Sequence, residues 1–343
     1  MWNRDSYLPL LGVLVADAAS LGLHWLYDRE RIAEVVQREG GCVFLTPNAA
    51  DYRGVAGYFG YPDKGSGDLS GYGETALLAA EVVATESGWN SAAYRQAFVR
   101  YFSAGGRYQG YIDQPTRALL TALQGPAEDW PPESGCDDEQ TPALATIPAL
   151  CACYSDLSEL KLRVKAATAV THRLPEVQQA GQALAHGLNL LLRGAPLEQA
   201  LQAVNDSLPG EWQARARSAC EGRPGLNELA EQWGTGCGLH ESLPLSLALI
   251  KRADSYSRAI TDNILLGGDS CGRALLVGAL AAAHWGMGEK GIPVGWLLRL
   301  NEHLRIARLL SRLAPLDKCS RYRGIDQVLH ATRREPGHEG PSA

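Results

Sequence analysis

The segment GGDSCGRALLVGALAAAHWG at residues 267–286 constrains the fold more than any other part of this chain. It is a long run of small and apolar residues, which is typical of a helix buried on all sides. Gly267 and Gly268 place an acid, Asp269, at the start of that helix, where Asp is a preferred N-cap residue. Free backbone N–H groups and the positive end of the helix dipole also gather anions there. Asp269 is therefore predicted to be a cap or part of a site.

Helical spacing of apolar residues recurs along most of the chain, beginning with residues 6–21, and almost no segment alternates as a strand does. Asp156 and Pro175 stand where a helix N-cap and a first-turn proline belong. Further helices are predicted near 28–38, 74–87, 89–102, 115–124, 196–206, 211–221, 242–264 and 293–313. Two stretches dense in Gly, Pro, Asp and Ser, 40–73 and 125–142, are predicted loops. The sequence predicts an all-α protein with one helical domain over 1–332 and a flexible tail over 333–343.

Composition and charge limit the class of protein. Hydrophobic residues make up 45% of the 343 positions and charged residues 20%, which suits a globular core rather than a disordered chain. The net charge of −6 argues against nucleic acid as a partner, because phosphate binding favours a basic surface. The longest apolar run, residues 274–283, is too short to cross a bilayer, so no membrane is expected. Eight cysteines without CxxC pairs or disulfide-framework spacing predict reduced thiols and a cytoplasmic location.

Four segments carry short polar motifs at helix starts or junctions: LGVLVADAASLGLHW at 11–25, GDLSGYGETALLAAEV at 67–82, AATAVTHRLPEVQQAG at 166–181 and GGDSCG at 267–272. In this order and spacing they resemble the ADP-ribosylglycohydrolase family of the dinitrogenase-reductase-activating glycohydrolase type. The motif sequences GDLSGYGET and GDSCGRA are more similar to those of a divergent branch that includes the jellyfish J1-crystallin-like proteins. The resemblance covers residues 6 to about 300 and implies a compact multi-helix orthogonal bundle.

The resemblance implies two acid clusters that hold divalent cations beside the bond to be cleaved. They fall on residues 72–75 and 269–272, where only Glu74, Thr75 and Asp269 keep oxygen ligands in matching places. Two carboxylates cannot neutralise two divalent cations, so we expect at most one ion, Mg²⁺ or Mn²⁺, or none. Glu74 and Asp269 are implied as the catalytic groups. The implied substrate-binding residues surround both helix starts: Asp17, His24, Asp68, Tyr72, Gly73, Cys271 and Arg273.

Several of these side chains also have a plain structural interpretation. His24 precedes a tryptophan on an apolar helix, which favours a core histidine over a catalytic base. Cys271 fits a small buried residue in a first helical turn, and its soft thiol suits Mg²⁺ poorly. Asp17 is costly within an apolar helix unless it is paired or lines a site. Aromatic loop residues suited to stacking on a base or sugar are Tyr52, Tyr58, Phe59, Tyr61, Tyr108 and Tyr111.

Two functions from different classes follow from this resemblance. The first is a glycohydrolase that cleaves an ADP-ribosyl or simpler ribosyl N- or O-glycoside, acting on a small nucleotide or ribosyl ligand or on an ADP-ribosylated protein. The second is a non-catalytic relative that binds a nucleotide or serves as a crystallin-like structural protein. The polar set around Glu74 and Asp269 favours the enzyme, because a scaffold has little reason to assemble it.

Overall fold

The computed structural model describes residues 6–221 and 224–313, and all regular elements in this part of the chain are helices. Their bounds are α1 Leu8–Ser20, η1 Leu21–Leu23, α2 Arg29–Glu39, η2 Ala49–Tyr52, α3 Gly71–Glu86, α4 Ser91–Phe102, α5 Gln114–Ala122, η3 Ala127–Asp129, η4 Thr141–Leu144, α6 Ile147–Cys153, α7 Leu157–Thr171, α8 Pro175–Leu192, α9 Leu197–Asp206, α10 Gly210–Glu221, α11 Leu226–Trp233, α12 Leu239–Arg252, α13 Tyr256–Leu265, α14 Ser270–Trp285, α15 Val294–Leu297 and α16 His303–Leu313, where η marks a 3₁₀ turn. The predicted all-α class is confirmed.

The helix bounds differ from the predicted ones where a cap interrupts an apolar pattern. The helix predicted over 242–264 is divided into α12 and α13, because Ser255 caps α13 by accepting a hydrogen bond from the Arg258 N–H at 3.3 Å. The helix predicted over 293–313 is likewise divided into α15 and α16. The short helices α6 and α11 were not predicted, since seven or eight residues give little periodicity. The predicted tail over 333–343 lies outside the described residues.

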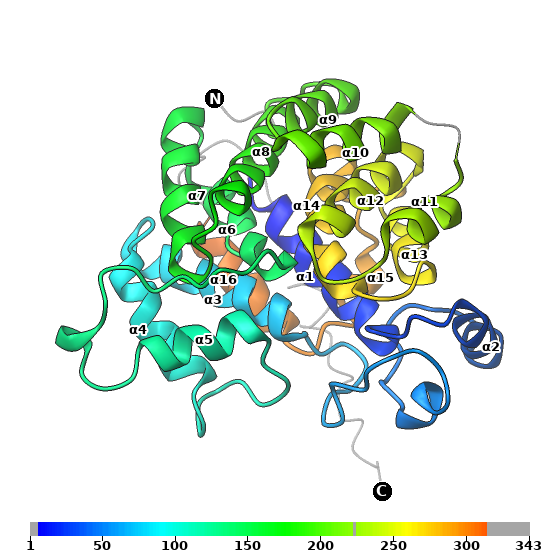
Figure 1. Ribbon diagram of the computed structural model, residues 1–343, viewed down its shortest axis with the longest axis horizontal. Coiled ribbons are helices and arrows are strands. Elements are labelled where there is room, and N and C mark those ends of the chain that lie inside the picture. The colour runs from blue at the N-terminus through cyan, green and yellow to red at the C-terminus, as the bar shows by residue number, and fades with distance from the viewer. Residues whose placement is uncertain (1–5, 222–223, 314–343) are drawn as a thin grey trace, which may run out of the picture.

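The helices α1 and α14 pack against each other in the middle of the molecule (Figure 1). Two glycines permit their close approach. A Cβ atom added at Gly12 would lie 2.3 Å from the carbonyl oxygen of Gly278, and one added at Gly278 would lie 2.6 Å from the carbonyl oxygen of Gly12. The Tyr256 hydroxyl, which comes from α13, donates a hydrogen bond of 2.6 Å to the Gly12 carbonyl oxygen and holds this crossing.

The predicted central helices are therefore buried, as the run of small residues required. α1 is buried from Leu8 to Ser20, and α14 is buried from Ser270 to Ala283. The helix α3 packs on both of them. α6 covers α1, while α8 and α12 cover α14. Because α3 and α14 both contact α1, the starts of these two helices are positioned relative to one common helix.

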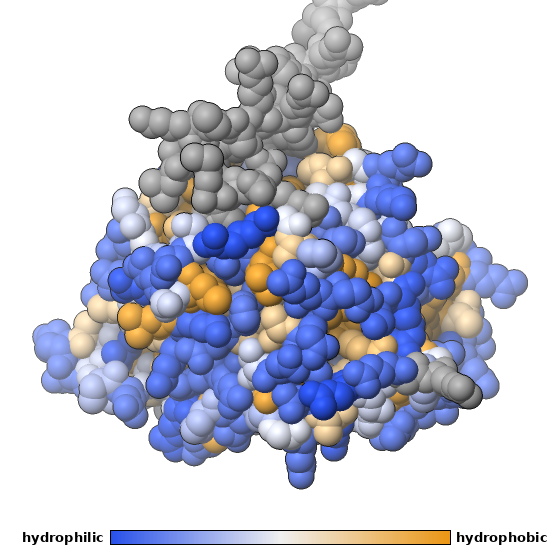
Figure 2. Space-filling view, turned by 90° about the horizontal axis from the view of Figure 1, so that it is seen from above, coloured by the Kyte–Doolittle hydropathy of each residue, from blue (hydrophilic) through white to orange (hydrophobic). Residues whose placement is uncertain are grey.

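The outer surface is polar, and Figure 2 shows hydrophobic residues only as small patches between hydrophilic ones on the face it presents. No helix within residues 6–221 and 224–313 is both long and apolar enough to span a bilayer. The seven cysteines of the described part carry free thiols.

Candidate functional site

The starts of α3 and α14 meet the C-terminal part of α1. Ser70, the N-cap residue of α3, donates its backbone N–H to Asp17 Oδ2 at 2.7 Å and its hydroxyl to Asp17 Oδ1 at 2.5 Å. At the start of α14, the Cys271 N–H donates to His24 Nδ1 at 3.2 Å, and the Cys271 thiol contacts the Asp17 carbonyl oxygen at 3.6 Å. Two motifs about 200 residues apart in sequence are thereby joined through α1 and the turn that follows it.

Asp269 caps α14, as its sequence position predicted. Gly267 and Gly268 have φ values of 76° and 69°, a conformation that only glycine adopts without strain, and they turn the chain into the helix. The Asp269 carboxylate accepts hydrogen bonds from the Gly272 N–H at 3.0 Å and the Thr141 hydroxyl at 2.9 Å. Burial raises the pKa of Asp269 from 3.8 to about 6, opposed by the charge of Arg273.

Asp17 is also fully buried, within α1. Burial raises the pKa of its carboxyl group from 3.8 to about 7, although both hydrogen bonds from Ser70 act in the opposite direction. Asp17 and Asp269 are thus two buried carboxyl groups whose charges both raise the pKa of Cys271, and their own pKa values are about 7 and about 6. The contact between Asp17 and Ser70 satisfies the requirement that an acid within an apolar helix be paired.

His24 is neutral and accepts a hydrogen bond in this arrangement. Its Nδ1 atom accepts a hydrogen bond from Cys271, which places the ring proton on Nε2. Burial holds the pKa of His24 well below 6.5, and the charge of Arg273 lowers it further, so His24 does not form an ion pair with Asp269. His24 Nε2 is buried and has no hydrogen-bond partner in the described part of the chain, whereas the buried Tyr72 hydroxyl contacts the Cys237 thiol. The two rings meet edge to face with 5.7 Å between their centroids.

Glu74 and Thr75 direct their oxygens to other partners. The Glu74 carboxylate accepts a hydrogen bond from the Tyr101 hydroxyl at 2.6 Å and lies 3.9 Å from Lys64 Nζ. Burial raises its pKa, and the hydrogen bond from Tyr101 opposes this. The Thr75 hydroxyl donates to the Gly71 carbonyl oxygen one turn earlier, at 2.8 Å. No contact joins either side chain to Asp269 among the described residues.

Asp68 and Arg273 hold loops at the edges of the site. Asp68 accepts hydrogen bonds from the Gly65 N–H at 2.8 Å and from Asn301 Nδ2 at 2.7 Å. Arg273 is fully buried and donates to Asn263 Oδ1 and to three backbone carbonyl oxygens, those of Asn263, Thr235 and Gly267. Its guanidinium group therefore fixes the glycine turn that positions Asp269.

The donor set does not fit the two-cation arrangement that the resemblance implies. Gly73 lies within the first implied acid cluster, at residues 72–75, but has no side chain, and a Cβ atom there would lie 2.3 Å from Asp17 Oδ2. The Asp17 carboxylate thus fills the space of the missing side chain. Within residues 6–221 and 224–313, no three His, Cys, Asp or Glu side chains are grouped so that they could hold a metal ion. Binding of a single ion by Glu74, Thr75 and Asp269 stays a prediction.

We expect the purified protein, dialysed against Mg²⁺ and Mn²⁺ and then against metal-free buffer, to retain at most one weakly held ion per chain. The reason is that hard divalent cations need several convergent oxygen ligands, whereas Glu74 and Thr75 bind Tyr101 and Gly71. Elemental analysis of the dialysed protein measures the ion content. Two tightly held ions per chain would contradict this donor assignment.

Sequence reasoning missed Trp25, which lies among the aromatic residues beside His24. Trp25 is 5% exposed, and its ring stacks on Tyr61 with 5.7 Å between centroids and meets the edge of Tyr111 at 4.9 Å. Its indole N–H donates to the Cys237 thiol at 3.4 Å. Trp25 has a φ of 61°, a strained conformation for a bulky residue, and such strain gathers at functional sites. Tyr58, which is 54% exposed, covers the outer edge of Trp25. Of the aromatic residues predicted to stack on a ligand, Tyr58, Tyr61 and Tyr111 pack on Trp25, whereas Tyr52 and Phe59 pack on each other and Tyr108 packs on Phe102.

The acid at position 17 has a measurable consequence for stability. Folding raises the pKa of the Asp17 carboxyl group from 3.8 to about 7. Such a group contributes stability to the folded state that is fully present below pH 3.8 and is lost as the pH rises to 7. We therefore expect Asp17→Asn to gain stability relative to the wild type between pH 4 and pH 7, by on the order of a few kcal/mol.

Urea unfolding of both proteins at several pH values measures this difference. The exposed Asp129 provides the matched control, since Asp129→Asn should change stability equally at each pH. A constant difference between Asp17→Asn and the wild type across the range would show that Asp17 titrates as an ordinary aspartate.

Comparisons with known proteins agree with the arrangement of helices and motifs. The sequence profile of the ADP-ribosylglycohydrolase family matches residues 9–322. Crystallin J1A of Tripedalia cystophora is 27% identical over 328 residues, covering 89% of this chain and 95% of the crystallin, and Crystallin J1B of the same animal is 26% identical over 329 residues with the same coverage. A solved ADP-ribosylglycohydrolase-related protein complex shares the fold, with a TM-score of 0.67, 20% identity and coverage of 90% of this chain and 97% of that chain. Since the profile spans most of the sequence, this chain belongs to the ADP-ribosylglycohydrolase family.

Proposed function

We propose that this protein hydrolyses a ribosyl N- or O-glycosidic bond, that of an ADP-ribosyl group or of a simpler riboside, with Asp17 and Asp269 as its acid–base pair. The observation that carries the proposal is the pair of fully buried carboxyl groups with pKa values of about 7 and about 6, placed where two helix N-termini meet. Catalytic acids and bases need pKa values near the working pH, and buried pairs of this kind are typical of active sites.

The proposed reaction assigns one proton transfer to each acid. Ionised Asp269 accepts a proton from water as the water oxygen bonds to the anomeric carbon. Protonated Asp17 donates its proton to the nitrogen or oxygen of the leaving group as the glycosidic bond breaks. The unpartnered Nε2–H donor of His24 is suited to hydrogen-bond the sugar or the leaving group, because a buried donor without a partner is costly. Hydrolysis of this kind commonly uses two carboxyl groups.

Substrate entry requires the aromatic cover to move. Trp25, Tyr58, Tyr61 and Tyr111 are packed on one another over the buried acids, and their faces are suited to stack on a base or sugar once separated. Such closure excludes water and strengthens electrostatic interactions at the bond being cleaved. A nucleotide-like ligand, free or attached to a protein as an ADP-ribosyl group, is the substrate class that this cover favours.

The alternative function is a non-catalytic, crystallin-like protein. It is favoured by the likeness to Crystallin J1A along 95% of that protein. The hydrogen bonds that Asp17 and Asp269 accept from Ser70, Thr141 and Gly272 also favour it, because they pair both carboxyl groups within the protein.

A substrate panel distinguishes the two functions. The full chain is incubated with an ADP-ribosylated peptide, O-acetyl-ADP-ribose, NAD⁺ and purine nucleosides, each with EDTA and with Mg²⁺, and products are identified by mass spectrometry. We expect release of ribose or ADP-ribose from at least one substrate, at equal rates with EDTA and with Mg²⁺. Absence of turnover from every substrate would favour the crystallin-like function, and a strict need for Mg²⁺ would restore a metal-dependent mechanism.

A further inference from the structure

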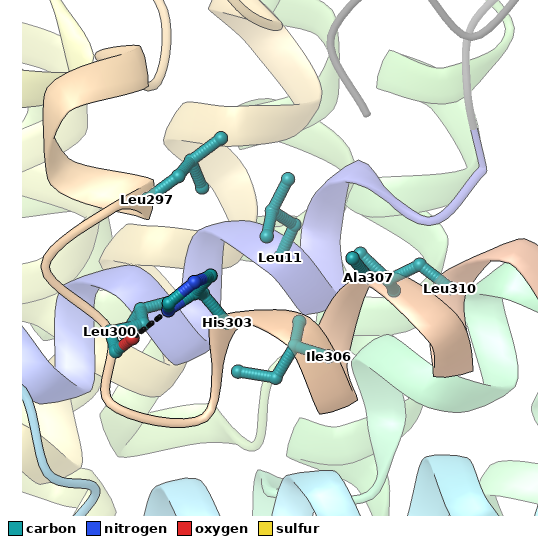
Figure 3. A pocket seen from close by; sticks show the side chains of 7 residues that line it. All are labelled: Leu11, Leu297, Leu300, His303, Ile306, Ala307 and Leu310. Carbon is teal, nitrogen blue, oxygen red and sulfur yellow. Dashed lines mark hydrogen bonds between the residues drawn. The ribbon is translucent and has the colours of Figure 1, made fainter. Parts of the chain in front are cut away.

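Several cavities lie outside the candidate site in the described part of the chain, and two of them differ strongly in size and polarity. The first is a groove of about 20 Å³ between α1, α15 and α16, lined by aliphatic side chains and by His303, whose Nδ1 contacts the Leu300 carbonyl oxygen at 2.8 Å (Figure 3). It holds no more than a water molecule. The second, which we name the Arg299 pocket, has a volume of about 510 Å³ and is walled by η1, α2, residues 44–51 and Arg299. Its size is that of a small-molecule site.

Arg299 is a cation that the described residues leave without a carboxylate partner. Its guanidinium carbon lies 4.5 Å from the centroid of the Phe44 ring, and its Nη2 donates to the Phe44 carbonyl oxygen at 3.1 Å. Its other N–H groups make no hydrogen bond and no ion pair within 4.0 Å in residues 6–221 and 224–313. Stacking on Phe44 and one backbone contact hold this planar group in place, which is the geometry that recognises carboxylate or phosphate.

The backbone under Arg299 is strained in a way that preserves this geometry. Phe44 is 2% exposed and has a φ of 56°, which is rare for an aromatic residue. Its carbonyl oxygen accepts a second hydrogen bond, from the Ser66 hydroxyl at 2.6 Å. Strained residues persist where the surrounding structure fixes them, and they gather at binding sites.

The pocket wall also carries two acids. Arg38 donates to both carboxylate oxygens of Asp51 at 2.9 Å and to Glu39 Oε1 at 2.8 Å, so one cation serves two carboxylates in this part of the wall. These carboxylates would repel a second anionic group on a ligand, whereas hydroxyl groups would donate to the exposed Glu39. Together, Arg299 and this acidic part of the wall favour a ligand with one oxyanion and a polyhydroxylated body.

We propose that the Arg299 pocket binds a small polyol that carries a single carboxylate or phosphate group, with the oxyanion on Arg299 and the hydroxyl groups toward Glu39. Neither the family's acid clusters nor the proposed acid–base pair uses this pocket. Leu23 lines the pocket and belongs to η1, the turn that ends next to His24. A ligand bound in the pocket would therefore contact the element that positions the candidate site.

Isothermal titration calorimetry on the full chain tests this site with ribose 5-phosphate, gluconate and neutral ribose. We expect saturable binding of at least one of the two anions that weakens with added salt, and no measurable binding of ribose. The two anions separate phosphate from carboxylate recognition. Arg299→Gln should weaken binding at least tenfold and Arg299→Lys less, because lysine keeps the charge without the planar fork.

Two further variants locate the binding. Arg217→Gln, an exposed arginine on α10, and Asp269→Asn in the candidate active site should both bind as the wild type does. Circular dichroism confirms that each variant is folded. The proposal is wrong if neither anion binds saturably to the wild type, if ribose binds as well as the anions, or if folded Arg299→Gln keeps wild-type affinity. Loss of binding in Asp269→Asn would place the ligand in the active site instead.

Discussion

Replacing Arg273 with methionine is expected to lower the free energy of unfolding by about 3–5 kcal/mol. Arg273 has no exposed surface, and its donors satisfy the carbonyl oxygens of Asn263, Thr235 and Gly267. Methionine fills much of the same volume but donates no hydrogen bond. The buried carbonyl oxygens of Asn263 and Gly267 then lose the partner that Arg273 provides, at a desolvation cost for each, whereas that of Thr235 keeps its hydrogen bond from the Asp269 N–H. It also removes the positive charge that lowers the pKa of Asp269.

Denaturant unfolding with a spectroscopic probe measures this loss. Arg258→Met is the matched control, because the Arg258 side chain is 64% exposed and makes only a surface ion pair with Asp262. That variant should change stability by less than about 0.5 kcal/mol. A loss in Arg273→Met no larger than in Arg258→Met would mean that the glycine turn before α14 does not depend on this guanidinium group.

Asp269→Asn is expected to lower kcat by about 10²- to 10⁴-fold while the protein stays folded. Asparagine is also a preferred N-cap residue, and its side-chain oxygen accepts from the Gly272 N–H or the Thr141 hydroxyl as aspartate does. It cannot accept a proton from water at neutral pH, so the loss falls on the chemical step rather than on the fold. Steady-state kinetics on the substrate found active in the panel, together with thermal unfolding, separate these effects.

Three companion variants sharpen this result. Asp17→Asn should lower kcat to a comparable extent, and Glu74→Gln should lower it less than about tenfold. Glu198→Gln, at an exposed position, should leave kcat unchanged. The small effect at Glu74 follows from its hydrogen bond to Tyr101, which directs its carboxylate away from Asp269. A fall of 10²-fold or more in Glu74→Gln, with Asp17→Asn near wild type, would move the second catalytic role to Glu74.

Much of the fold was predictable because its signals are local. The apolar run after Asp269, the acid that caps it and the proline that begins α8 each follow from backbone hydrogen bonding within one helical turn. Failures occurred where the local signal is weak or is hidden within a longer apolar pattern. The division between α12 and α13 depends on the Ser255 cap within an otherwise helical pattern, and α6 is too short to show a period.

The candidate site was predictable as a set of segments but not as a set of contacts. From sequence, Gly73 is a missing ligand, whereas in the structure its lack of a side chain makes room for the Asp17 carboxylate. Arg273 was expected to bind substrate, and that role stays a prediction, while its donors contact the loop before α14. Trp25 donates a hydrogen bond to Cys237, and Thr141 donates one to Asp269, although the partners lie far apart in the sequence. No local pattern links such pairs.

The dependence of kcat/KM on pH, measured in EDTA, tests the central claim that Asp17 and Asp269 form a metal-independent acid–base pair. The account predicts a bell-shaped profile that rises through the pKa of Asp269 near 6, falls through the pKa of Asp17 near 7, and is unchanged by Mg²⁺. The rising limb should disappear in Asp269→Asn, together with most of the activity. A profile that is flat between pH 5 and 8, or activity that EDTA abolishes and Mg²⁺ restores, would contradict it.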